Sequence, residues 1–120
     1  MTTDKFNEKY KDYIEEGHYG LDIENENIIK YLDDVFKDLI KIPGFKYSQI
    51  KEKFGWLRFY IELCNDAVIY DYIRTAEENS SKICHYCGTT ENLGHTTGWI
   101  LISCEECATK HNKTWVAKNE

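Results

Sequence analysis

Residues 83–108 read ICHYCGTTENLGHTTGWILISCEECA, and this stretch decides the fold of the C-terminal third of the chain. It contains two CxxC pairs that are separated by 16 residues. The paired residues are Cys84, Cys87, Cys104 and Cys107. Two residues between cysteines let both sulfurs of a tight turn face one ion, and the spacing is typical of a zinc ribbon. The sequence therefore predicts one Zn²⁺ ion bound by four thiolates.

The predicted metal site is structural rather than catalytic, because four sulfurs complete a tetrahedron and leave no position for water or substrate. Two histidines lie near the pairs in sequence, His85 inside the first and His111 four residues after Cys107. Either one could replace a cysteine or lie behind the ligands. Two disulfides or a dithiol redox pair are the alternative interpretations, which the metal-type spacing and the missing export signal disfavour.

Residues 1–44 are predicted to form helices with an acidic surface. Apolar residues recur at helical spacing over residues 6–14, with Thr3 placed to cap this helix and Gly17 placed to end it. After a turn-like stretch, a second apolar face over residues 29–40 predicts another helix, which a proline and a glycine end. The simplest interpretation of both apolar faces is that they pack in the core and have no separate function.

Residues 45–81 are predicted to form a β-hairpin and a third helix. Hydropathy alternates over residues 45–51 and 56–63, with a turn near Gly55 between the two strands. Helical spacing over residues 67–80 predicts a helix that leads directly into the first CxxC pair.

The whole chain, residues 1–120, is predicted to be a single compact domain, since its length fits one core. The expected fold class is α+β, with N-terminal helices, a β-hairpin, a third helix and a C-terminal four-cysteine zinc ribbon. Its three parts are the acidic helical part (1–44), the hairpin plus helix (45–81) and the zinc ribbon part (82–120).

The formal net charge is −6, and the excess of acid is concentrated in the first part. Residues 1–44 hold 6 lysines against 11 aspartates and glutamates, a balance of −5. An acidic surface disfavours nonspecific nucleic-acid binding and suits a protein partner better. Residues 1–6 lack the features of a secretory signal, and no apolar run approaches the roughly 20 residues that cross a bilayer. We therefore expect the chain in the cytoplasm.

No catalytic motif accompanies the cysteines. The sequence has no phosphate-binding glycine loop, no HExxH and no GxSxG. Cys64, the fifth cysteine, is interpreted as a small buried hydrophobe, with a catalytic thiol as the alternative. We expect no enzymatic activity.

The second strand of the hairpin places Trp56, Arg58 and Tyr60 on one face, opposite its apolar positions. The cations on or near the hairpin are Lys46, Lys51, Lys53 and Arg58. Basic side chains beside aromatic rings are typical of surfaces that bind nucleic acid. A nucleic-acid-binding accessory or regulatory protein is therefore the alternative function.

Several linked motifs also resemble a family of small uncharacterised bacterial and phage proteins. They are QIKEKFGWLRFY at residues 49–60, an Ala-Glu-Glu stretch ending the third helix, the first CxxC pair followed by glycine, a Gly-Trp dipeptide and the second CxxC pair. The resemblance covers about residues 49–108 and departs from the family at Trp56, where a second glycine is usual. It implies a metal-stabilised accessory protein, often carried by mobile elements, with no established enzymatic activity.

Together these observations favour a noncatalytic, zinc-stabilised interaction protein that binds a protein partner. A phage or prophage origin would fit an inhibitor of a host defence complex, such as an anti-CRISPR protein. In that hypothesis the acidic helices imitate the charge of nucleic acid, although acidity also serves solubility.

Overall fold

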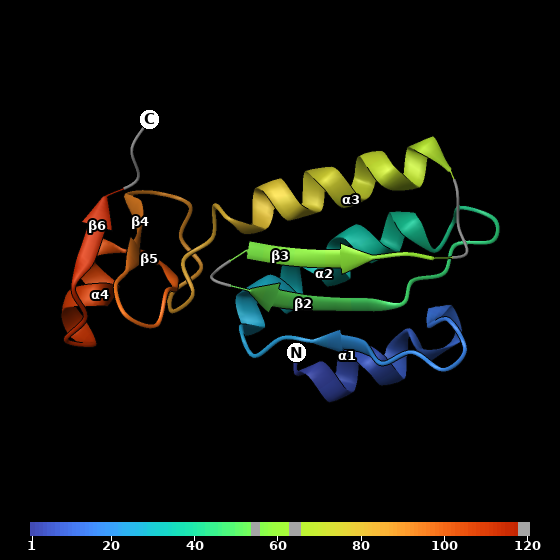
Figure 1. Ribbon diagram of the computed structural model, residues 1–120, viewed down its shortest axis with the longest axis horizontal. Coiled ribbons are helices and arrows are strands. Elements are labelled where there is room, and N and C mark those ends of the chain that lie inside the picture. The colour runs from blue at the N-terminus through green and yellow to red at the C-terminus, as the bar shows by residue number, and fades with distance from the viewer. Residues whose placement is uncertain (54–55, 63–65, 118–120) are drawn as a thin grey trace.

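The computed structural model describes residues 1–53, 56–62 and 66–117, and these form an α+β fold. Four α-helices and two three-stranded sheets are present in the described residues. The molecule is elongated, at 44 × 29 × 22 Å, with the second sheet and the last helix gathered at one end (Figure 1). The predicted fold class is confirmed.

The first sheet consists of β1 (Gly20–Asp22), β2 (Gln49–Lys53) and β3 (Trp56–Tyr60), in that order. β1 runs parallel to β2, and β2 pairs with β3 as an antiparallel hairpin. The predicted hairpin is present, but its first strand begins at Gln49 rather than at residue 45. The preceding stretch bonds elsewhere, because the Tyr47 nitrogen donates to the Tyr13 carbonyl at 2.9 Å. The predicted turn at Gly55 lies outside the described residues.

The first three α-helices each begin after a residue whose side chain accepts a hydrogen bond from a backbone N–H group of the first turn. The Thr2 hydroxyl caps α1 (Thr3–Lys9), whereas the predicted cap, Thr3, instead donates to the Ile23 carbonyl at 2.5 Å. α1 is shorter than predicted because the chain tightens after it into a 3₁₀ turn, η1 (Lys11–Tyr13).

The two longer helices match the predicted spans closely. The Asn25 side chain caps α2 (Glu26–Leu39), and the Asp66 carboxylate caps α3 (Ala67–Ser80). Both caps accept hydrogen bonds from backbone N–H groups that a helix start would otherwise leave without partners. Among the described helices, none combines the length and the apolar character needed to cross a membrane.

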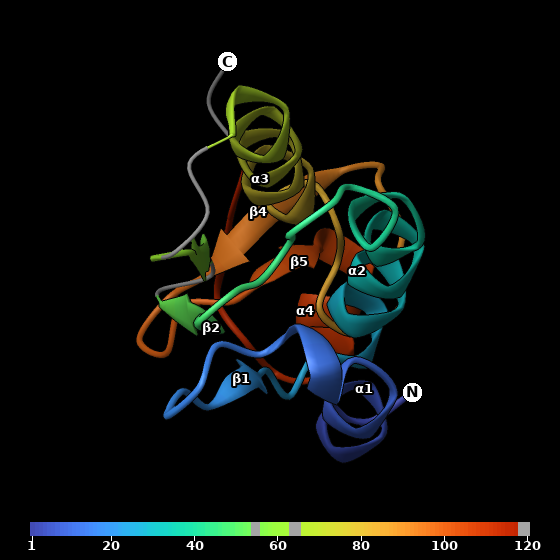
Figure 2. The ribbon, with the colours of Figure 1, turned by 90° about the vertical axis from the view of Figure 1, so that its right-hand side faces the viewer.

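The main core lies between the first sheet and the helices. Phe36 of α2 is at its centre, with its ring centroid 4.9 Å from that of Phe6 and 5.2 Å from that of Tyr47. From the sheet, Leu57 and Phe59 enter the same cluster. Figure 2 shows α2 and α3 on one side of β2 and β3, so the helices leave the opposite face of the hairpin uncovered.

The second sheet has the order β5-β4-β6, and both pairings are antiparallel. Its elements, with the last helix, are β4 (Leu93–Thr96), β5 (Ile102–Cys104), α4 (Glu105–Lys110) and β6 (Trp115–Ala117). Between the two CxxC pairs, residues 93–96 thus form a strand, and of residues 98–102 only Ile102 belongs to one. The sequence of β4 lacks the usual strand alternation because Gly94 has no side chain. Trp115 packs against this glycine, and a Cβ there would meet the Val116 carbonyl at 2.1 Å.

A side-chain contact joins the N-terminal part to the ribbon part, and a second joins α3 to α2 beside that connection. The Asn27 amide, in the first turn of α2, donates to the His85 carbonyl at 3.3 Å. The Asn79 amide, near the end of α3, donates to the Tyr31 hydroxyl at 3.2 Å. Since α3 also leads straight into the first CxxC pair, the start of α2 and the end of α3 together hold the ribbon part in place.

Candidate metal centre

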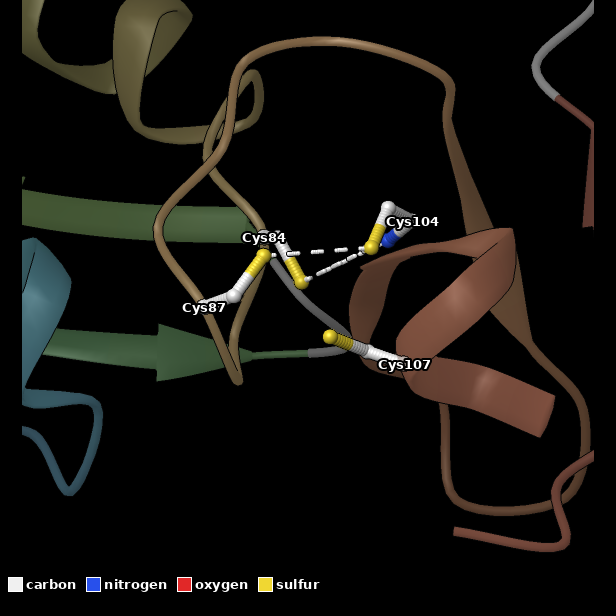
Figure 3. A group of neighbouring side chains, drawn as sticks. All are labelled: Cys84, Cys87, Cys104 and Cys107. Carbon is white, nitrogen blue, oxygen red and sulfur yellow. Dashed lines mark hydrogen bonds between the residues drawn. The ribbon is translucent and has the colours of Figure 1, made fainter. Parts of the chain in front are cut away.

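The four cysteines come from three separate elements of the ribbon part. Cys84 and Cys87 lie in the turn that follows α3, Cys104 is the last residue of β5, and Cys107 lies in the first turn of α4. Figure 3 shows all four side chains directed toward one another across a small space. The structure thus brings together every residue that the sequence proposed as a ligand.

The distances between the sulfur atoms suit a single bound metal ion. The Cys104 sulfur lies 3.8 Å from those of both Cys84 and Cys87, and all four sulfurs lie within 4.8 Å of one another. Sulfurs at about 2.3 Å from a tetrahedral ion are about 3.8 Å apart, whereas a disulfide joins them at about 2.05 Å. The four cysteines are free thiols here, so the disulfide interpretation has no support in the structure.

The first cysteine turn is shaped by its backbone. The Gly88 nitrogen donates to the Cys84 carbonyl at 3.1 Å, and Gly88 itself has a φ of +79°. That conformation favours glycine. A Cβ at this position would also approach the Asn27 side-chain oxygen to 3.0 Å, so the glycine permits both the turn and its contact with α2.

Without an ion, the cluster cannot hold four thiolates. Burial raises the pKa of the Cys84 thiol, but hydrogen bonds from three backbone groups outweigh burial and lower the pKa to about 6. These groups belong to Cys87, Cys104 and Tyr86. Burial raises the pKa of Cys107 to about 12, with hydrogen bonds to Cys104 and Cys87 acting in the same direction. A cation is therefore needed to deprotonate the complete set, and metal binding must release protons.

The two neighbouring histidines do not join the sulfur cluster, which among the described residues contains cysteines alone. The Tyr86 ring instead stacks on the His111 ring, with centroids 3.9 Å apart and planes 12° from parallel. The His85 ring lies edge-on to the Tyr86 ring, with centroids 5.0 Å apart. This aromatic group links the first cysteine turn to the end of α4, a contact that cysteine spacing could not reveal.

The set of four cysteines is closed and mostly buried. Cys84, Cys104 and Cys107 are exposed by 8% or less, and only Cys87 faces solvent. The fifth cysteine, Cys64, lies outside the described residues. The arrangement can therefore bind a metal ion and fix three elements around it, but it offers a substrate no open coordination position.

A second group of possible ligand atoms brings together Glu15, His18 and Glu62. The His18 ring nitrogen Nε2 lies 3.0 Å from a Glu62 carboxylate oxygen, and a Glu15 oxygen accepts from the Glu62 backbone nitrogen at 3.1 Å. Sequence spacing gave His18 no role. These contacts join the segment after η1 to the residues that follow β3, so we assign them a role in stabilising the fold.

The aromatic and basic residues of the hairpin lie as the alternation predicts. Trp56, Arg58 and Tyr60 are exposed, whereas Leu57 and Phe59 between them are buried. Lys46 lies outside the strands, and its ammonium group donates to the Asp12 carbonyl at 3.0 Å. The predicted basic cluster is therefore formed by strand residues, without Lys46.

Comparison of the chain with protein-family models, curated proteins and solved structures finds no match. The resemblance to small bacterial and phage proteins therefore stays a prediction.

Proposed function

We propose that the chain is a noncatalytic interaction protein whose C-terminal part is held together by one structural Zn²⁺ ion. The observation that supports this most strongly is the closed set of four sulfurs, spaced as a tetrahedral ion requires. Zinc suits such a set because it accepts tetrahedral thiolate coordination and has no redox chemistry of its own. When bound, the ion supplies charge to hold the thiolates and no reactive position.

Native mass spectrometry of the purified chain tests the metal assignment. We expect one Zn²⁺ per chain, which a Cys104→Ser, Cys107→Ser double variant loses. Cys64→Ser is the matched control, since it removes a cysteine that belongs to neither CxxC pair and should retain the ion. Iron in place of zinc, or full zinc content in the double variant, would overturn the proposal.

For the partner, we propose a protein. The support is an acidic surface together with exposed aromatic side chains, of which Trp99 is 81% and Tyr19 79% exposed. Exposed aromatic residues are enriched at protein interfaces. The resemblance to phage proteins supports a more specific proposal: the partner is a host defence complex, and the chain is its inhibitor, such as an anti-CRISPR protein.

This narrower proposal is tested with a panel of purified CRISPR effector complexes. Equimolar amounts of the chain should stop DNA cleavage by at least one complex, and the metal-free double cysteine variant should inhibit much less. A charge-reversed Asp34→Lys, Asp38→Lys variant, at two exposed positions of α2, tests whether the acidic face is the one that binds. If no complex is inhibited at tenfold excess of the chain, the anti-CRISPR proposal fails.

A second candidate function, nucleic-acid binding, is favoured by one specific observation. Two exposed aromatic rings and an exposed arginine alternate along β3 on the face that α2 and α3 leave uncovered (Figure 2). Lys51 and Lys53 lie opposite them on β2. A labelled oligonucleotide titrated at two salt concentrations tests this candidate, because phosphate contacts make the affinity fall steeply with salt.

A further inference from the structure

The uncovered face of the hairpin combines cations with flat rings. Lys51 lies opposite Arg58 and Lys53 opposite Trp56 in the strand register, so these side chains share one face. The Lys51 ammonium lies 5.8 Å from the centre of the Tyr60 ring. Trp56 and Tyr60 are exposed by 52% and 45%. The face therefore offers apolar rings with positive charge between them.

The local charge of this face is opposite to that of the whole chain. Among its strand residues, three cations oppose one carboxylate, Asp22, which lies beside Lys51 on β1. Beyond the end of β3, the exposed Glu62 carboxylate is paired with His18. The formal charge of the chain is −6, and its acidic residues are concentrated before residue 45. A polyanion is thus attracted to the hairpin face and repelled by the N-terminal helices, which directs it to one surface.

A cavity of about 340 Å³ opens beside this face, where the hairpin meets the ribbon part. Its lining is mostly apolar and comprises Trp56, Ser81, Leu93, Gly94, His95, Ile100 and Ile102. Ile100 is 37% exposed. Trp56 belongs both to the cavity and to the exposed row of β3. A ligand lying along that row can therefore place one group into the cavity.

We propose that this cavity receives one base of a single-stranded nucleic acid whose phosphates lie over Lys51 and Arg58. The proposal rests on the second candidate function. A base has two apolar faces and a polar edge, which match the Trp56 and Ile100 side chains on the walls and His95 with Ser81 as the polar groups.

The dimensions favour one base and its sugar over a larger group. Small-molecule sites span about 300–1,000 Å³, and this cavity is at the lower end of that range. A single strand is required because the bases of a duplex are paired and stacked, and stacking on Trp56 needs a free face. An apolar protein side chain would also fill the cavity, but it would bring no anionic group to Lys51 and Arg58.

Fluorescence anisotropy with a labelled twelve-nucleotide single strand, at about 50 mM salt, tests the proposal. Trp56→Ala and Ile100→Ala should each weaken binding about 5- to 100-fold, the range that loss of one stacked base produces. Trp56→Phe should retain most of the affinity, since it keeps a ring. Tyr70→Ala is the matched control, because Tyr70 is an exposed aromatic residue of α3 outside the face and the cavity.

The phosphate contacts are tested separately with Lys51→Glu and Arg58→Glu. Both should weaken binding, and each should lower the slope of log affinity against log salt by about 0.7, the value for one phosphate of a single strand. Lys30→Glu, on α2, is the charge-matched control. Far-ultraviolet circular dichroism and zinc content establish that each variant is folded.

The outcomes separate this inference from the function on which it rests. If the charge variants lose affinity and the cavity variants do not, nucleic-acid binding stands and the base site is wrong. Heparin supplies charge without bases, so equal weakening of heparin binding by Trp56→Ala also overturns the base site. Equal affinity for a duplex would do the same. If the wild-type chain binds no oligonucleotide at 50 mM salt, both proposals fail.

Discussion

The two parts of the molecule are stabilised by different means. In the N-terminal part, seventeen of the described residues form one buried apolar cluster between the first sheet and its helices. Among the described residues of the ribbon part, the buried cluster consists of three of the four cysteines, with Tyr86 and Leu93 partly buried against it. Burial of apolar side chains can stabilise the first part alone, whereas the second has too little to bury. We therefore expect the ribbon part to depend for its stability on the proposed metal ion.

The largest effect we predict is the unfolding of the ribbon part when the metal ion is removed. Structural Zn²⁺ contributes about 10–16 kcal/mol of binding free energy in small domains that fold around it. With a strong chelator, amides of residues 84–117 should lose protection from hydrogen exchange, while those of α2 and β3 should keep it. Cooperative loss of protection in both parts would show instead that contacts such as that of Asn27 with the His85 carbonyl join them into one folding unit.

The reciprocal change removes the centre of the apolar core. Phe36→Ala should destabilise the N-terminal part by about 3–5 kcal/mol, because Phe36 is fully buried and its ring packs against several others. Urea unfolding followed by tyrosine fluorescence measures the loss, and Val68→Ala, at an exposed position of α3, should change little. The variant should still bind one Zn²⁺ per chain. Loss of the metal would mean that the ribbon part folds only on an intact core.

A glycine substitution tests the packing of the second sheet independently of its ligands. In Gly94→Ala the new methyl group would overlap the Val116 carbonyl and the Trp115 ring, so β6 must move away from β4. Overpacking of this kind costs about 1–3 kcal/mol. Hydrogen exchange at Val116 should accelerate while zinc content stays at one per chain, and Thr97→Ala serves as the control. An unchanged exchange rate would mean that β6 adjusts without cost.

Sequence patterns correctly predicted the elements whose conformation is determined by residues close together in the chain. The cysteine spacing identified all four members of the sulfur cluster, and the apolar spacing over residues 67–80 predicted α3 over its observed span. They failed where a distant contact decides the conformation. β1 pairs with β2 across the whole of α2, and β4 contains Gly94 because Trp115 covers it. The same is true of the stacking of His111 on Tyr86, since residues 25 positions apart meet only after the ribbon part folds.

The smallest effect we predict concerns the acidic helices, and it depends on pH. Burial opposes ionisation of Asp33, but hydrogen bonds donated by Lys9 and Tyr10 outweigh burial and hold its pKa below the usual value. A carboxylate whose pKa is lower in the folded state stabilises the fold above its unfolded pKa of about 3.9 and loses this contribution as pH falls through the folded value. Asp33→Asn should therefore destabilise the N-terminal part by about 1 kcal/mol at pH 7, with the difference from wild type shrinking below about pH 4.

Hydrogen-exchange protection of α2 amides, compared between wild type and variant at each pH, measures this effect without depending on the metal site. Asp34→Asn is the matched control, because the Asp34 carboxylate lies 3.0 Å from Lys37 and is 66% exposed. An ion pair so open to solvent contributes little to stability. If both variants lose the same small amount at pH 7, the contact of Tyr10 with Asp33 does not stabilise the fold. The acidic surface would then be available for partner binding without any structural constraint from this pair.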